Sequence, residues 1–300
     1  MCKNKNVSLI FAAAALLAMT VLGSVWDYEI ANALYVGQGA SDNIFGIIFA
    51  FIGIIPTFVG WSFLGASIVC LSKKHITYKP KRRGLIALAV LLFVLSFFYF
   101  CNTIMMVNAN AFSVHWMIAY PIGIAVILLA AWLGYTLSKN NNDPELLKTV
   151  LILAVVSLVT LIIIMSTKGI MNRPRYRFVL ESSNAQYFRN WWQSGRDIKE
   201  SIDISAPSDE FTSFPSGHSA YSMFAIFLFP AIADYLPRLR KYRVALFVLG
   251  SLWWGLTALS RLTVGAHYLT DVSIAGLVTV ASYAAVMLVR RAILQRRERS

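Results

Sequence analysis

The chain of 300 residues is 58% hydrophobic and 14% charged, whereas soluble domains average about 45–50% and about 25%. With a mean hydropathy of +0.63, it has too few charged residues to give a globule of this size a polar surface. Its 9 prolines, 17 glycines without a period and 3 cysteines also exclude disordered, collagen-like and disulfide-stapled chains. The composition therefore predicts an all-α, polytopic bundle of membrane-spanning helices.

The net charge of +13 could indicate nucleic-acid binding. However, the basic residues stand between apolar runs, and no basic folded domain carries them. Cytoplasmic loops of membrane proteins accumulate Lys and Arg, which explains the charge better. We therefore expect no nucleic-acid partner. The cysteines show no metal-ligand spacing, and we expect no metal and no other cofactor.

Eight segments are long and apolar enough to cross a bilayer, which takes about 20 residues. In chain order they are residues 7–25, 44–71, 84–107, 112–137, 149–167, 217–236, 243–259 and 272–290. The fifth is the clearest, because Lys148 and Lys168 bracket a stretch without any charge that would be roughly 28 Å long as a helix. The first could be a signal peptide, but it lacks a convincing cleavage site, so we interpret it as a retained anchor.

The charges of the connections predict the orientation. Segment 72–83 holds six basic and no acidic residues, whereas connection 26–43 has three acids and no base. The connection at 237–243 and the tail 294–300 are basic again. The positive-inside rule then places both termini in the cytoplasm and segment 167–216 outside. Short loops and the lack of an organelle-targeting segment favour a bacterial plasma membrane.

Three patterns lie on the predicted outer face. The first, Lys168-Gly-Ile-Met-Asn-Arg-Pro-Arg175, follows the fifth segment. The second, Pro215-Ser-Gly-His218, opens the sixth. The third, Ser260-Arg-x5-His-x3-Asp271, links the seventh and eighth. A motif of four fixed positions occurs by chance in about 0.2% of chains of this length, so two such motifs on one face are a specific signal.

Together the patterns resemble those of the type 2 phosphatidic acid phosphatase superfamily, which includes membrane lipid phosphatases such as undecaprenyl-diphosphatases. The resemblance covers residues 84–293 as a six-helix core. Residues 1–83 would then add two helices and a basic loop, and 294–300 a basic tail. The family form of the first pattern is Lys, six residues and Arg-Pro. Counted from Lys168, this spacing places the motif arginine at Arg175, although Tyr176 replaces the proline. Arg173 would then be a helper.

The resemblance implies that His267 is the nucleophile, Asp271 its partner, and His218 the acid that protonates the leaving group. His267 and Asp271 are one helical turn apart, so the carboxylate could fix the imidazole tautomer. The other motif residues would bind phosphate oxygens through cations, a hydroxyl and backbone N–H groups. They are Lys168, Arg175, Arg261, Ser216 and Gly217, with Arg173 in support.

The predicted function is metal-independent hydrolysis of a lipid phosphomonoester or pyrophosphate at the outer face, with membrane lipid as partner. Undecaprenyl diphosphate, phosphatidic acid and phosphatidylglycerophosphate are candidate substrates. Phosphotransfer to an acceptor other than water is the alternative within enzymes, and a transporter or catalytically silent scaffold the alternative outside them. In the outer segment, the aromatic and basic residues of 187–199 predict an amphipathic helix on the membrane or on the bundle.

Overall fold

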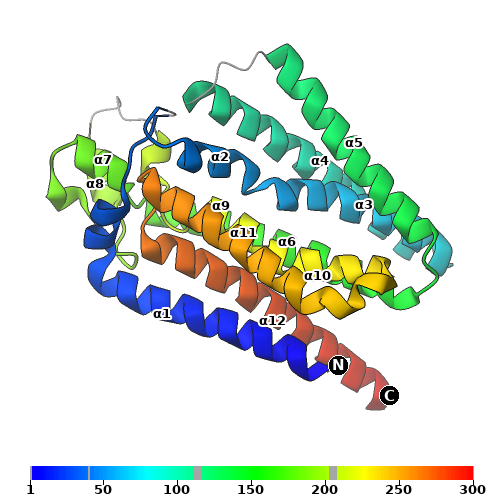
Figure 1. Cartoon of the computed structure of the whole chain (residues 1–300). Helices are drawn as coiled ribbons and strands as arrows, with labels where there is room; N and C mark the ends of the chain where they lie inside the picture. The colour runs from blue at the N-terminus through cyan, green and yellow to red at the C-terminus, as the bar shows by residue number, and fades with distance from the viewer. Residues whose placement is uncertain (1, 40, 111–115, 203–207, 300) are drawn as a thin grey trace. The chain divides into compact units, whose positions relative to one another are not determined.

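The computed structural model describes residues 2–39, 41–110, 116–202 and 208–299, which are helical and contain no strand (Figure 1). The predicted all-α class is therefore confirmed for the described part of the chain. The α-helices are α1 (Cys2–Leu34), α2 (Ile44–Ile52), α3 (Ile55–His75), α4 (Lys79–Asn110), α5 (Trp116–Lys139), α6 (Pro144–Met171), α7 (Tyr176–Glu181), α8 (Arg196–Ser201), α9 (Gly217–Met223), α10 (Ala225–Tyr235), α11 (Arg243–Thr263) and α12 (Leu269–Arg299). The 3₁₀ helices are η1 (Ala185–Tyr187), η2 (Ser208–Phe211) and η3 (Pro237–Tyr242).

Seven helical stretches of the described chain are long and apolar enough to cross a membrane, which makes the protein a multi-pass membrane protein. The sixth predicted segment, 217–236, is present as two short helices, because α9 ends at Met223 and α10 starts at Ala225. The start of the fourth predicted segment, 112–115, lies outside the described residues.

The chain divides into two compact units. The first comprises residues 1–50, 159–223 and 254–285, and the second 51–158, 224–253 and 286–300. In the second unit, α3 packs against α4 and α5. Several of its buried polar groups are paired between helices, as when the indole of Trp61 donates to the Ser157 hydroxyl at 2.9 Å. Such pairing is needed where no water can reach a polar group.

In the first unit, α1 lies along the beginning of α12 (Figure 1). The hydroxyls of Thr20 and Ser273 are 2.9 Å apart. A Cβ atom at Gly23 would lie only 2.8 Å from Cγ2 of Thr270, so glycine allows the close approach. One turn later, this approach brings Asp27 of α1 to the N-terminus of α12.

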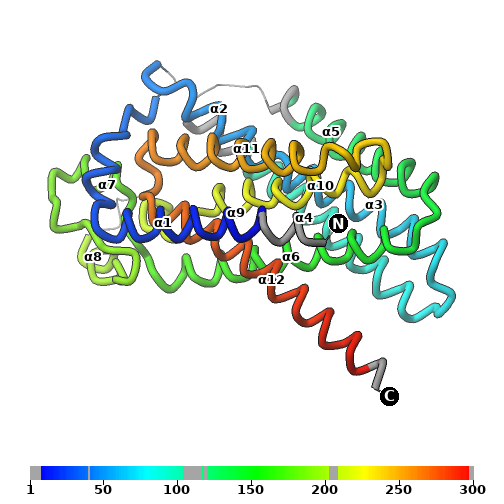
Figure 2. Tube along the Cα trace, turned by 60° about the horizontal axis from the view of Figure 1, so that its bottom comes forward, coloured from blue at the N-terminus to red at the C-terminus, as the bar shows by residue number. Residues whose placement is uncertain are grey.

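The chain between α6 and α9 forms short helices near the C-terminal end of α1 (Figure 2). The amphipathic helix predicted over 187–199 is wrong, because η1 ends at Tyr187 and α8 begins only at Arg196. Side chains fix this non-helical path. Trp191 stacks on Phe214 with the ring centroids 6.0 Å apart and donates from its indole to the Ser24 hydroxyl at 2.9 Å.

Candidate active site

The three sequence patterns meet in the first unit, at the segment just before α9. The Ser216 N–H donates to the Asp271 carbonyl at 3.1 Å, and Nδ1 of His267 lies 2.6 Å from the Ser213 carbonyl oxygen. From the last turn of α6, the Lys168 ammonium donates to the Thr212 carbonyl. Residues that are up to about a hundred positions apart thus form one cluster.

The His267 imidazole is held by the backbone. A carbonyl oxygen can only accept, so Nδ1 must carry the proton toward Ser213, and Nε2 keeps its lone pair. Burial lowers the pKa of His267 to about 3, and the charges of Lys168 and Arg175 act in the same direction while Asp271 opposes them. At neutral pH the ring is therefore uncharged and carries its lone pair on Nε2.

Asp271 does not hydrogen-bond to His267, because Oδ2 lies 3.7 Å from Nδ1. Instead Oδ2 accepts from the Ser213 hydroxyl at 2.5 Å and from the Tyr268 N–H at 2.8 Å, which caps the start of α12. The residue that contacts both the acid and the imidazole is thus Ser213. Sequence reasoning missed it because a serine three positions before Ser216 carries no signal of its own.

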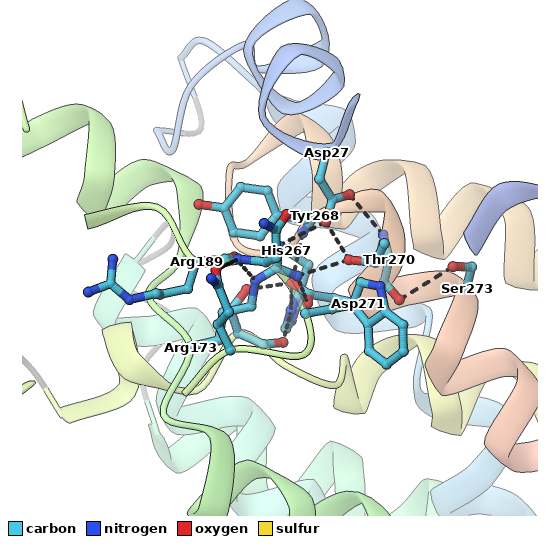
Figure 3. Close-up of polar contacts among 12 residues, drawn as sticks. Asp27, Arg173, Arg189, His267, Tyr268, Thr270, Asp271 and Ser273 are labelled. Carbon is cyan, nitrogen blue, oxygen red and sulfur yellow. Dashed lines mark hydrogen bonds and ion pairs between the residues drawn. The ribbon is translucent and has the colours of Figure 1, made fainter. Parts of the chain in front are cut away.

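Arg173 is fully buried, and Figure 3 draws its polar contacts within the first unit. Its Nη1 donates to Oδ1 of Asp271 at 2.6 Å, and its Nη2 donates to Oδ2 of Asp27 at 2.8 Å. Its Nε donates to the Arg189 carbonyl at 2.8 Å, and the guanidinium lies 4.2 Å from the centroid of the Tyr268 ring. All three nitrogens are engaged, which makes Arg173 a part of the framework.

Arg175 is placed differently. Its side chain is 13% exposed, and Nη1 lies 3.1 Å from Oδ2 of Asp209. Nη2 donates to the Thr212 hydroxyl at 3.3 Å. Its Nε is buried without a hydrogen-bond partner in the described part of the protein. Arg175 therefore has a free donor for an anion, whereas Arg173 has its nitrogens on protein oxygens.

The remaining predicted residues lie at the same cluster. A Cβ atom at Gly217 would lie 3.7 Å from Cε of Lys168, so the lysine stem passes beside this glycine. Ser216 is buried, and its Oγ accepts from the Ser219 N–H at 3.3 Å. His218 is half-buried and close enough to Arg261, His267 and Lys168 for their charges to act on it.

Arg261 is buried near the end of α11. Its Nη2 donates to the Gly46 carbonyl of α2 at 2.7 Å, and its Nε donates to the Ser260 hydroxyl at 3.2 Å. No three His, Cys, Asp or Glu side chains among the residues that the structure describes are grouped as metal ligands would be. Lys168, Arg175 and Arg261 bring three cationic side chains to this cluster, close enough for their charges to act on His218.

Asp27 is a second residue that sequence reasoning missed. Its Oδ1 accepts from the Thr270 N–H at 3.0 Å, in addition to the bond from Arg173. In the sequence it is one of three acids in a connection predicted to face outward, and no spacing relates it to the motifs. Only the packing of α1 on α12 shows which residues it meets.

The fold and this cluster define a multi-pass helical membrane protein with a set of imidazoles and cations at the ends of its helices. The family model of the PAP2 superfamily matches residues 145–294, half of the chain. The chain belongs to this superfamily, which carries phosphatase-type or phosphotransferase-type activity on phosphate esters. Comparisons with curated proteins and with solved structures found no match.

The matched residues contain all three patterns and leave out α1–α5. The division into a core of 84–293, two N-terminal helices and a basic tail stays a prediction.

Proposed function

We propose that the protein hydrolyses a phosphomonoester or pyrophosphate bond of a membrane lipid at the outer face, through a phosphohistidine on His267. The observation that carries the proposal is the hydrogen bond from Nδ1 of His267 to the Ser213 carbonyl. It fixes a neutral ring whose Nε2 is a nucleophile, in a cluster that holds three cations for the phosphate.

In the first step, Nε2 of His267 attacks phosphorus, and the bond between phosphorus and the leaving oxygen breaks. His218 gives its proton to that oxygen, so the lipid alcohol or lipid phosphate leaves in protonated form. In the second step, His218 accepts a proton from water, whose oxygen attacks phosphorus, and the P–N bond breaks to release phosphate and neutral His267. The Ser213 carbonyl stabilises the cationic imidazole between the two steps.

The phosphate oxygens would be bound by Lys168, Arg175 and Arg261, together with Ser216 and Gly217. The unpaired Nε of Arg175 supports this role. A loose transition state places charge on the phosphoryl oxygens, where fixed guanidinium groups lower its energy. We therefore expect turnover without a divalent metal.

A lipid substrate is supported by the apolar helices that carry the site, because α6, α11 and α12 each include a stretch suited to crossing a bilayer. A phosphate group bound at the ends of these helices can belong to a lipid whose tail lies between or beside the helices in the bilayer. Undecaprenyl diphosphate, phosphatidic acid and phosphatidylglycerophosphate all fit this description.

The test is phosphate release by detergent-purified protein from a panel of these three lipids, in the presence of EDTA. His267→Ala should abolish turnover and the labelled phosphoenzyme. His218→Ala should slow turnover by about 10²–10⁴-fold, the contribution of a general acid. His75→Ala, which changes a histidine at the end of α3, should retain the wild-type rate. Wild-type turnover by His267→Ala would contradict the proposal.

A further inference from the structure

The first helix contributes a buried carboxylate to the candidate site. Asp27 is 3% exposed, and within the described residues its carboxylate accepts from the site framework: Nη2 of Arg173, the Thr270 N–H and the Thr270 hydroxyl (Figure 3). Residue 27 lies far outside the stretch 145–294 that the family model matches. The site thus includes a residue from outside the matched stretch.

Helix packing alone does not account for a carboxylate at this position. A buried anion near a membrane is expensive, and replacing a buried ion pair by apolar residues is often neutral or stabilising. Neighbouring positions of α1 already meet α12 through small or uncharged residues such as Thr20 and Gly23. The charge of Asp27 therefore calls for an electrostatic explanation.

That explanation follows from the charges around Arg173. Its guanidinium lies between two carboxylates, 2.8 Å from Asp27 and 2.6 Å from Asp271. If Asp271 were the only carboxylate, it would be neutralised by Arg173. With Asp27 sharing the guanidinium, the group carries a net negative charge beside His267, whose Nδ1 is 3.7 Å from Asp271. Such a charge stabilises the imidazole as it becomes cationic.

A second contact supports a role for the N-terminal residues. The carbonyl of Gly46 in α2 accepts from Nη2 of Arg261 at 2.7 Å and so orients another cation of the site. We propose that Asp27 is a positioning residue of the reaction, which acts through Arg173 and Thr270 to hold Asp271 and to keep negative charge next to His267. This inference rests on the proposed function, in which His267 is the nucleophile.

The test compares Asp27→Asn with Glu29→Gln, which removes an exposed carboxylate two residues further along the same helix. Because the described contacts of Asp27 are with Arg173 and Thr270, whose donors are on protein oxygens, Asp27→Asn should lower kcat while leaving KM near the wild-type value. The expected loss in kcat is roughly 10²-fold, the size of effect that a misplaced catalytic group produces. Glu29→Gln should match the wild type, and Asp27→Glu, which keeps the charge, should recover part of kcat.

A purely structural role for Asp27 gives a different result: a lower melting temperature and a smaller active fraction, with the remaining molecules turning over at the wild-type kcat. That result would overturn the proposal, as would equal losses in Asp27→Asn and Glu29→Gln. If Asp27→Asn fails to fold, Thr270→Ala leaves both charges in place and removes one support of Asp27. It should then lower kcat at unchanged KM, and an unchanged kcat would overturn the proposal.

A measurement without turnover separates this inference from the proposed function. In protein labelled with ¹⁵N-histidine, the His267 ring signals are assigned by their loss in His267→Ala. Asp27→Asn should shift them, and Glu29→Gln should not. If the wild type releases phosphate from no lipid, the proposed function fails, yet a shift still supports the electrostatic link from Asp27 to His267. Unchanged His267 signals in Asp27→Asn would overturn it.

Discussion

Ser213 connects Asp271 with His267, the proposed nucleophile, through its two oxygen atoms. Its hydroxyl donates to Asp271, and its carbonyl accepts from Nδ1 of His267. Asp271 therefore acts on His267 by fixing Ser213 and by its charge, and not by a direct hydrogen bond. In such an arrangement the tautomer of the imidazole is set by the backbone, which can supply no proton to the ring.

The two arginines of the first motif should respond differently to substitution. Under the proposed function Arg175→Ala removes a donor to the phosphate, so it should raise KM and lower kcat without a change in melting temperature. Arg173→Ala leaves Asp27 and Asp271 buried without their cation, which typically costs about 3–5 kcal/mol. Thermal unfolding of both variants, measured beside lipid phosphate hydrolysis, checks this. Wild-type activity of Arg175→Ala would show that the assignment of the motif arginine is wrong.

The low pKa of His267 makes stability depend on pH in a specific direction. Between the unfolded value of 6.5 and about 3, the unfolded chain binds a proton at this residue and the folded protein does not. Acidification through this window therefore favours unfolding, by up to about 1.4 kcal/mol per pH unit from this group. Above pH 6.5 the His267 imidazole is neutral in both states and makes no contribution to the pH dependence of the free energy of unfolding.

His267→Gln is the matched variant for this effect, since it removes the titration and keeps a polar side chain. Its melting temperature relative to the wild type should rise as the pH falls from 7 to about 4, because only the wild type loses the contribution of His267. The measurement is thermal unfolding in detergent over this pH range. A constant difference in melting temperature between the two proteins across this pH range would contradict the buried, neutral state of His267.

At the scale of elements, the sequence predicts long spans well and their interruptions poorly. The predicted fifth segment, 149–167, lies inside α6, because a charge-free apolar run admits only a helix in a membrane. The division of 217–236 near Phe224 was not predictable from hydropathy, since both halves are apolar. Nor was the non-helical path of 188–195, which depends on contacts such as that of Trp191 with Phe214.

The same distinction holds for the site. Lys168, His218 and His267 come together as the motifs predict, because each motif lies at the end of an apolar run on the same predicted face. The partners Asp27 and Ser213 required the packing of distant elements, and one sequence without its fold contains no spacing that relates them to the motifs. The clustering of the motif residues was thus predictable, and the residues that hold them in place were not.

For the whole molecule, the path of the chain around the site bears on the number of crossings. The chain leaves the site at Gly217 and returns to it at His267, next to Ser213. On the return it passes through α11, which is long enough for one crossing. We infer that α9 and α10 together make a crossing before it, and their residues 217–235 would span roughly 28 Å as a helix, about the thickness of the apolar layer.

With this crossing there would be eight in total, and the positive-inside rule predicts both chain ends on the cytoplasmic side. Single cysteines in a variant with all three native cysteines replaced by serine test this arrangement. A membrane-impermeant maleimide should label Ser194→Cys, an exposed position between α7 and α8, in intact cells. Thr77→Cys and Gln295→Cys, also exposed, should react only after the membrane is permeabilised, because their basic surroundings are retained in the cytoplasm. Labelling of Gln295→Cys in intact cells would mean that the chain crosses the membrane an even number of times between Ser194 and the tail. That result would contradict the paired crossing of α9 and α10.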